Sequence, residues 1–419
     1  MEFIVAHGTL ILLLACAFGF FMAWGIGAND VANAMGTSVG SGVLTIKQAI
    51  IVAMIFEFLG AYLAGGEVTQ TVRSGIVDSS VLENTPHLLV YGMLSTLLGT
   101  AVWLTIASAK GWPVSTTHTV IGAIIGFAAV GIGVDAVQWS KIWNIVGGWV
   151  LSPVLAGVVS YTLFRSVQIL ILDTPDPFVQ AKRYVPIYLF LTGFMVSMVT
   201  FMKGLKHVGL NLSPLASVGF AVLTGVLITL IGKMLLAKIE PSPDQDRRFR
   251  FASTERLFGV LMIFTACSMA FAHGSNDVSN AVGPLAAIYS VIADGSVNSS
   301  TRVPSWILLL GGVGIVAGLA MFGRRVMHTI GKKITELTPS RGFAAELGAA
   351  STVVLATGTG LPVSTTHTLV GAILGVGFAR GIGAIDLRVV RGIFASWFVT
   401  LPAGAFFSTI FFFLFIALF

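Results

Sequence analysis

The sequence predicts an all-α, polytopic membrane protein, and three observations support that fold class. Of the 419 residues, 55% are hydrophobic and only 10% are charged, and the mean hydropathy is +0.92. Apolar stretches of roughly 17 to 25 residues, the length that crosses a bilayer as a helix, recur along the whole chain. Polar motifs interrupt these stretches, and the same motifs return in the second half of the chain.

About twelve apolar segments are predicted to be transmembrane helices, and some of them are expected to be half-helices or re-entrant elements. Basic residues gather on the cytoplasmic side of membrane proteins. With an extracytoplasmic N-terminus, the loops after odd-numbered segments hold 19 of the 24 Lys and Arg residues. We therefore expect a multi-pass protein of the plasma (inner) membrane, with both termini extracytoplasmic and the central loop cytoplasmic. The segments lie at 9–28, 43–64, 87–109, 113–134, 141–164, 185–202, 213–237, 257–273, 304–323, 343–360, 362–380 and 391–418.

The net charge of +6 would suit a nucleic-acid partner in a soluble protein. Here the basic residues lie between apolar segments and set orientation, so the predicted partner is the lipid bilayer and not a nucleic acid. Cys16 and Cys267 lie inside apolar stretches without metal or redox spacing, and they indicate nothing about compartment. The oligomeric state stays open, a homo-oligomer included.

An internal repeat runs through the chain. GANDVANAMG at 27–36 matches GSNDVSNAVG at 274–283, and PVSTTHT occurs at 113–119 and again at 362–368. A third, weaker match begins at Trp149 and Trp397, and the three offsets are 247, 249 and 248 residues. Offsets this constant indicate duplication.

Each half of the repeat holds five segments, and two connecting segments separate the halves, so the second half starts on the opposite side of the membrane. Inverted repeats of this kind are typical of secondary transporters, whose binding site lies at the repeat interface near the bilayer midplane. We expect the first inverted repeat at 1–165, two connecting helices with a short basic cytoplasmic loop at 166–256, and the second inverted repeat at 257–419.

The two Asn-Asp motifs are candidate cation sites. Asp30 and Asp277 follow long uncharged runs, and an ionised carboxylate at such depth costs about 2.5 to 3.5 kcal/mol. No Lys or Arg occurs in either motif, so we expect a bound cation as the partner. Asparagines spaced by four share a helix face, and carboxylate and amide oxygens suit an alkali cation. The predicted sodium ligands are Asn29, Asp30, Asn33, Asn276, Asp277 and Asn280.

Flanking glycines are expected to let the helices unwind and free carbonyl oxygens as further ligands. They are Gly27, Gly36, Gly274 and Gly283. The alternative is that the asparagines only form hydrogen bonds between helices. Two copies related by a symmetry axis favour ion binding.

The PVSTTHT motifs have the pattern of a helix N-terminus, with Pro113 and Pro362 compatible with the cap or the first turn. The first amides of a helix have no internal partner, and a buried N-terminus attracts anions. Hydroxyl donors beside it could hold a tetrahedral oxyanion without an arginine. The alternative is capping alone, the commoner role of Ser and Thr. The predicted phosphate ligands are Ser115, Thr116, Thr117, Ser364, Thr365 and Thr366.

Four further residues are accessory candidates. His118 and His367 could donate to the anion, move protons or support the hydroxyls, and the sequence slightly favours the supporting role. Glu57 and Glu346 are carboxylates in apolar surroundings. Neither glutamate has a counterpart at the repeat offset, so neither is expected in the symmetric core.

GANDVANA, GSNDVSNA and the two PVSTTHT copies resemble the signature of the inorganic phosphate transporter (PiT) family, over nearly the whole chain. The family includes sodium- and proton-coupled phosphate carriers and related sulfate permeases. The resemblance implies phosphate uptake coupled to a cation gradient, an extracytoplasmic N-terminus and essential aspartates matching Asp30 and Asp277. The stretch RGFAAEL at 341–347 resembles a family segment with a functionally sensitive glutamate, here Glu346. The animal members carry a long central loop, which this chain lacks.

The expected function is secondary active import of inorganic phosphate by symport with sodium, through alternating access. The alternative is a proton-coupled phosphate or sulfate permease, because the sequence does not decide between sodium ions and protons. No enzyme activity is expected: a hydrolase built on Ser115 and His118 rests on weak spacing and would need two active sites. A passive anion channel would leave the buried aspartates unexplained.

Overall fold

The computed structural model describes residues 2–83, 85–110, 112, 114–202, 212–241, 251–294, 303–330, 338–381 and 387–419. Within these ranges the chain is helical almost throughout, and the β-structure is limited to one isolated bridge between Val77 and Val137. Nine of the described helices are long and apolar enough to cross a membrane. The predicted all-α polytopic class is confirmed, while the number of twelve spans stays a prediction.

Every predicted segment overlaps a helix of the structure. The first part of the chain forms α1 (Glu2–Gly40), α2 (Ile46–Ala64), α3 (Gly66–Ser74), α4 (Ser79–Leu82), α5 (Pro86–Ala109), α6 (Thr116–Gly126) with a π-helical extension Phe127–Ile132, a 3-10 turn Val134–Ala136, and α7 (Trp139–Val167) with a π-helical extension Gln168–Leu172. The rest forms α8 (Pro177–Met202), α9 (Pro214–Ala237), α10 (Ala252–Asp294), α11 (Ser305–Ile330), α12 (Pro339–Gly358), α13 (Thr365–Arg380) and α14 (Leu387–Leu418).

The helix ends follow ordinary capping chemistry. Thr45 forms a capping box with Gln48 at the start of α2, in which each residue's side chain accepts from the backbone amide of the other. Proline occupies the first turn of α5, α9 and α12, where its missing N–H costs no helical hydrogen bond. Local sequence therefore fixes where several helices begin.

The expected unwinding at the Asn-Asp motifs is wrong. Both α1 and α10 continue as helices through their motifs, to Gly40 and Asp294. The glycines instead allow helices to touch: a Cβ at Gly27 would lie 1.9 Å from the carbonyl oxygen of Ile315, and one at Gly274 would lie 2.1 Å from that of Glu57. Close approach at small residues is how membrane helices pack.

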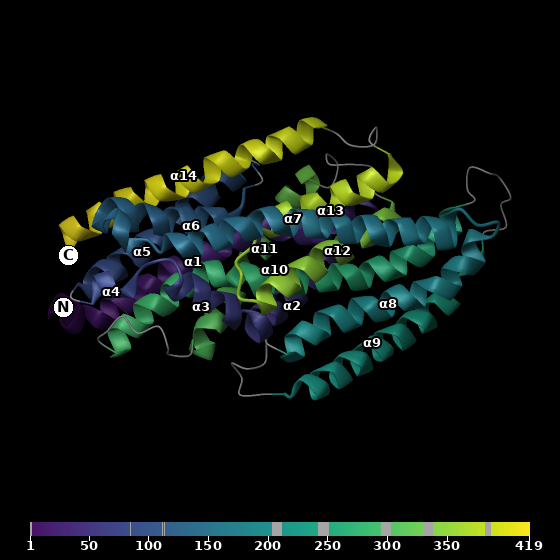
Figure 1. Cartoon of the computed structure of the whole chain (residues 1–419), viewed down its shortest axis with the longest axis horizontal. Helices are drawn as coiled ribbons and strands as arrows, with labels where there is room; N and C mark the ends of the chain where they lie inside the picture. Colours follow the sequence, from purple (N-terminus) through teal and green to yellow (C-terminus); the bar gives the residue numbers. More distant parts are fainter. Residues whose placement is uncertain are drawn as a thin grey trace.

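Helices from the two parts of the chain are interleaved. α1 packs on α11 and α2 on α10, while α6 packs on α14 and α13 on α7. The start of α1 and the end of α14 lie at the same end of the molecule (Figure 1). α8 and α9 form a hairpin at the margin of the bundle, with α9 outermost (Figure 1). The interleaving brings α1, α6, α10 and α13 together at one polar centre.

Candidate functional site

The polar centre contains both Asn-Asp motifs. Asn29, Asp30 and Asn33 lie on α1, and Asn276, Asp277 and Asn280 lie on α10, and all six side chains are buried. The two motifs are far apart in sequence, and both are buried among helices.

The N-termini of α6 and α13 meet at this centre. The Thr117 hydroxyl donates to the carbonyl oxygen of Val363 at 3.1 Å, and the indole of Trp149 donates to that of Pro362 at 3.1 Å. The rings of His118 and His367 lie 4.5 Å apart, nearly perpendicular. The hydroxyl-bearing ends of two separate helices thus face each other.

Each of these helices is capped by its serine. The Ser115 hydroxyl accepts the backbone N–H of His118 at 3.2 Å, and the Ser364 hydroxyl accepts that of His367 at 3.3 Å. A hydroxyl that accepts one hydrogen bond can still donate one, so capping leaves each serine able to serve an anion. Pro362 lies two residues before its cap rather than in the first turn, and Pro113 lies outside the described residues.

Each Asn-Asp motif contacts the helix end of the other half of the chain. The Asn33 amide donates to the Thr366 hydroxyl at 2.6 Å. The Asn280 amide lies 3.3 Å from the Thr117 hydroxyl and 3.5 Å from that of Thr116. The predicted cation ligands and the predicted anion ligands therefore share hydrogen bonds.

The first asparagine of each motif anchors the segment that leads into a helix end. Asn29 donates to the Ser108 hydroxyl at 2.9 Å, and Asn276 donates to the Thr357 hydroxyl at 3.1 Å. Asn276 also approaches the carbonyl oxygen of Leu361 at 3.5 Å. These contacts correspond to each other across the repeat.

Asp277 has a partner that the sequence reasoning missed. His273 Nε2 lies 3.0 Å from Asp277 Oδ2, and His273 Nδ1 lies 3.2 Å from Glu57 Oε1. The Thr365 hydroxyl donates to the same Asp277 oxygen at 2.8 Å. The partner of Asp277 within the protein is thus a histidine, and Glu57 joins the same cluster although it has no counterpart in the other half. The spacing of four between His273 and Asp277 was the available signal.

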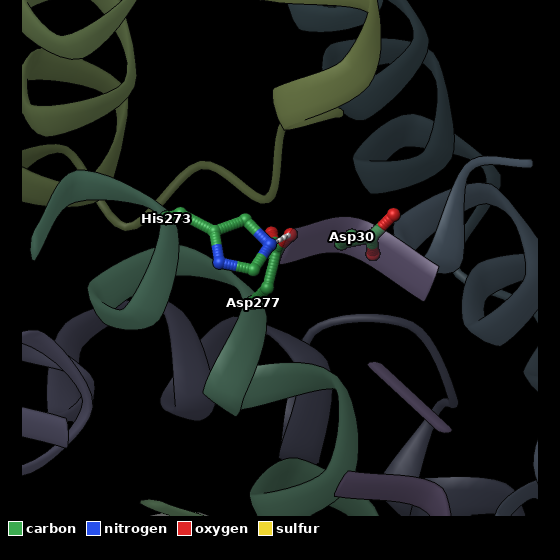
Figure 2. Close-up of side chains that lie close together, drawn as sticks. All are labelled: Asp30, His273 and Asp277. Carbon is green, nitrogen blue, oxygen red and sulfur yellow. Dashed lines mark ion pairs between the residues drawn. The ribbon is translucent and has the colours of Figure 1, made fainter. Parts of the chain in front are cut away.

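Asp30 lies opposite the His273–Asp277 pair (Figure 2). Asn33 donates to Asp30 Oδ1 at 3.1 Å, and Oδ2 has no hydrogen-bond partner among the described residues. One ligand atom each from Asp30, His273 and Asp277 lies within 4.8 Å of the others.

Within the described part of the chain, several buried oxygens of the centre lack donors: Asp30 Oδ2, Asn276 Oδ1, Asp277 Oδ1 and Asn280 Oδ1. Buried polar atoms normally have partners, and carboxylate and amide oxygens are the ligands that hard cations prefer. The donor set fits an alkali cation.

The model for the phosphate transporter family matches residues 26–408. The chain belongs to the phosphate transporter family. It is 54% identical to a protein of Haemophilus influenzae named as a phosphate permease, over 99% of this chain and 98% of that one. It is 45% identical to the chloroplastic inorganic phosphate transporter 2-1 of Arabidopsis thaliana, over 93% of this chain and 69% of that one. A solved structure titled as the sodium-dependent phosphate transporter matches with a TM-score of 0.92 at 37% identity, over 98% of this chain and all of that one.

The accessory candidate Glu346 of this phosphate transporter has only hydroxyl partners among the hydrogen bonds of the described residues. Glu346 is fully buried on α12 and accepts hydrogen bonds from the hydroxyls of Thr37, Ser38 (2.6 Å) and Thr265 (2.6 Å). Sequence reasoning found Glu346 but not these hydroxyls, because they lie on α1 and α10 and belong to neither duplicated motif.

The two histidines of the PVSTTHT motifs lie in an aromatic cluster. The His118 ring packs on Trp149 with centroids 3.9 Å apart, and His367 packs against His118. Both side chains are buried. A supporting role for both histidines stays a prediction.

Proposed function

We propose that this phosphate transporter imports inorganic phosphate together with sodium ions, by alternating access. In this account Asn29, Asp30 and Asn33 hold cations in one half, and Asn276, Asp277 and Asn280 hold them in the other. The hydroxyls at the ends of α6 and α13 hold the phosphate: Ser115, Thr116 and Thr117 in one half, Ser364, Thr365 and Thr366 in the other.

The observation that carries this proposal is that direct hydrogen bonds join the proposed cation ligands to the proposed phosphate ligands. Asn33 bonds to Thr366 and Asn280 reaches Thr117, so each cation motif contacts the anion-binding end of the opposite half. A cation that orders either asparagine also orders the hydroxyl beside it. Occupation of one site therefore prepares the other, and this coupling is reciprocal.

Electrostatic repulsion supports an order in which cations bind before phosphate. Asp30 and Asp277 are buried, and an anion brought near two buried carboxylates is repelled strongly because the surrounding dielectric is low. Cations that neutralise the carboxylates remove that repulsion. Phosphate then binds well only after the cations have bound.

Sodium is favoured over protons by the oxygen donors of the centre, and the structural neighbour is named for sodium dependence. Proton coupling is the second candidate, because His273 lies between Glu57 and Asp277 and such a cluster can hold a proton.

The proposal includes the inverted repeats at 1–165 and 257–419, joined by the helices of 166–256. One repeat would move relative to the other around a fixed site, as in other transporters with this symmetry. Extracytoplasmic termini and residence in the inner membrane are part of the same proposal. The start of α1 and the end of α14 lie at the same end of the molecule (Figure 1), which supports termini on one side.

Uptake of labelled phosphate into proteoliposomes of the pure protein tests the coupling. An inward sodium gradient is compared with an inward proton gradient at equal sodium, and with no gradient. We expect accumulation above equilibrium only with sodium. Accumulation driven by protons alone would favour the second candidate, and equilibration without any gradient dependence would leave a channel.

A further inference from the structure

A groove lies between α8 and α9, the two helices of the hairpin at the margin of the bundle (Figure 1). Its volume is about 350 Å³, and its walls include the exposed apolar side chains of Ile187, Val226 and Leu230. Pro186 and Phe190 complete the apolar part of the wall. Both helices are long and apolar enough to cross a membrane, so these exposed walls face lipid chains.

Two polar residues line the groove, Thr229 and Lys233. The Thr229 hydroxyl donates to the carbonyl oxygen of Gly225 at 2.7 Å, in the preceding turn of its own helix, and lies 3.5 Å from that of Pro186. Its proton is therefore engaged by the backbone. Lys233 is exposed and lies at the end of the groove nearest the C-terminus of α9. The groove thus offers a ligand an apolar surface and, at one end, an ammonium group.

Lys233 lies inside an apolar stretch of α9. No charged residue occurs from Pro214 to Gly232, and the residues at 234–237 are apolar as well. An ammonium group in such a stretch is costly, so it either reaches the lipid headgroups or pairs with an anion. Among the described residues no carboxylate lies within 4.0 Å of it, since both ion pairs found there belong to His273. The ammonium group is therefore available to an anion from the bilayer.

A second lysine lies at the same level of the hairpin. α8 and α9 run in opposite directions, and Thr229 approaches Pro186 between them. One turn further along each helix, Lys233 and Lys182 therefore come opposite each other. Two like charges at one level repel, and an anion beside them removes that repulsion. This arrangement fits a negatively charged group better than a zwitterionic one.

We propose that the groove between α8 and α9 binds one anionic phospholipid, with an acyl chain along Ile187 and Leu230 and the phosphate beside Lys233. With the central loop on the cytoplasmic side, as proposed above, Lys233 lies at the cytoplasmic leaflet. Anionic lipids are found in that leaflet, and basic pockets between membrane helices bind their headgroups there. A second copy of the chain fits less well, because a symmetric interface would bring the same lysines together. The inference is independent of the ion that drives transport.

The experiment is native mass spectrometry of the purified, delipidated full chain, titrated with dioleoylphosphatidylglycerol or dioleoylphosphatidylcholine. The two lipids have the same acyl chains and differ in net charge. We expect the wild type to hold one phosphatidylglycerol molecule more tightly than phosphatidylcholine. One lysine near the headgroups contributes about a 5-fold preference for an anionic lipid, so Lys233→Gln should lower the preference by about that factor. Lys233→Arg keeps the charge and should keep the preference.

Lys238→Gln is the matched control, because Lys238 caps the C-terminus of the same helix and does not line the groove. Its preference for phosphatidylglycerol should equal that of the wild type. Val226→Trp tests the apolar part of the site, because a larger side chain there fills the groove. It should weaken the binding of both lipids by the same factor. Thermal unfolding in detergent checks that each variant is folded.

Several results would overturn the inference. Equal retention of the two lipids by the wild type would mean that Lys233 only extends to the headgroup region. An equal loss of preference in Lys233→Gln and Lys238→Gln would assign it to general surface charge. Displacement of phosphatidylglycerol by excess inorganic phosphate would indicate a site for a free anion, and a dimer without bound lipid would indicate that a second copy covers the groove.

Discussion

The two Asn-Asp motifs show what duplication preserves and what it changes. The asparagines make corresponding contacts: Asn33 reaches Thr366, and Asn280 reaches Thr117. The aspartates do not correspond, since Asp277 faces His273 at 3.0 Å whereas Asp30 makes no ion pair within 4.0 Å among the described side chains. The hydrogen bonds of the asparagines are therefore repeated in both halves. The contact between an aspartate and a histidine is found, among the described residues, only in the second half.

The comparison bears on coupling. Two identical sites would fill with cations of equal affinity, and the transporter would have no built-in order of binding. The Glu57–His273 pair beside Asp277 gives the two aspartates different electrostatic surroundings, and nearby charged groups change the free energy of binding a cation. The two halves of the site are therefore expected to be equal in geometry and unequal in charge.

The largest effect is expected from neutralising the aspartates. Asp30→Asn and Asp277→Asn each remove a carboxylate that we propose as a cation ligand, and interactions with charged groups contribute about 1.5 to 3 kcal/mol, which corresponds to about 10- to 150-fold. We expect sodium-driven uptake to fall by about that factor in both variants. Initial rates of uptake at saturating phosphate check this, with the unmutated protein as reference.

Asp277→Asn should differ from Asp30→Asn in one respect. It removes one partner of His273 and leaves His273 paired with Glu57 alone, whereas Asp30→Asn leaves the Glu57–His273–Asp277 contacts intact. Fully sodium-driven accumulation in either variant would show that the aspartate concerned is not a cation ligand.

The next largest effect concerns packing. Gly27→Ala and Gly274→Ala each place a methyl group within 2.1 Å of a neighbouring carbonyl oxygen. Overpacking costs about 1 to 3 kcal/mol. Thermal unfolding in detergent should show similar losses in the two variants. Gly147→Ala is the control, since nothing lies within 4 Å of its Cβ, and a loss there as large as at Gly27 would contradict the packing argument.

A smaller effect is expected at the shared hydrogen bonds. Thr366→Val and Thr117→Val keep the side-chain shape and remove the hydroxyl that each asparagine contacts. One neutral hydrogen bond contributes about 0.5 to 1.5 kcal/mol, so phosphate affinity should fall about 2- to 10-fold in each. Equilibrium binding of labelled phosphate measures this. An unchanged phosphate affinity in both variants would show that these two hydroxyls do not bind the phosphate.

The smallest effect is expected outside the membrane segments. Ser80 donates to Asp78 through its amide at 3.0 Å and its hydroxyl at 2.7 Å, and these bonds lower the pKa of Asp78 below 3.8. Such a carboxylate stabilises the fold above its ordinary pKa, and the contribution is lost as pH falls through the lower, folded value. Asp78→Asn should therefore leave sodium dependence at pH 7 unchanged, with any stability difference disappearing in acid. A changed sodium dependence would contradict this.

Much of the fold was predictable because apolar runs long enough to span a bilayer mark membrane helices directly. The centre was predictable in part, because the duplicated motifs give Asp30, Asp277 and the hydroxyl runs. The Glu57–His273 pair was not, since it forms between α2 and α10 through tertiary packing and has no copy in the other half. The glycines were misread for a related reason: sequence shows a missing side chain but not the carbonyl that occupies its place.

The most direct test of the account is phosphate binding to the purified protein as sodium is varied at constant ionic strength, with choline as the replacement cation. The account predicts that the dissociation constant for phosphate falls steadily as sodium rises, and that Asp30→Asn flattens this dependence. A phosphate affinity independent of sodium, in a protein that still binds phosphate, would contradict the claim that cations at the Asn-Asp motifs prepare the anion site.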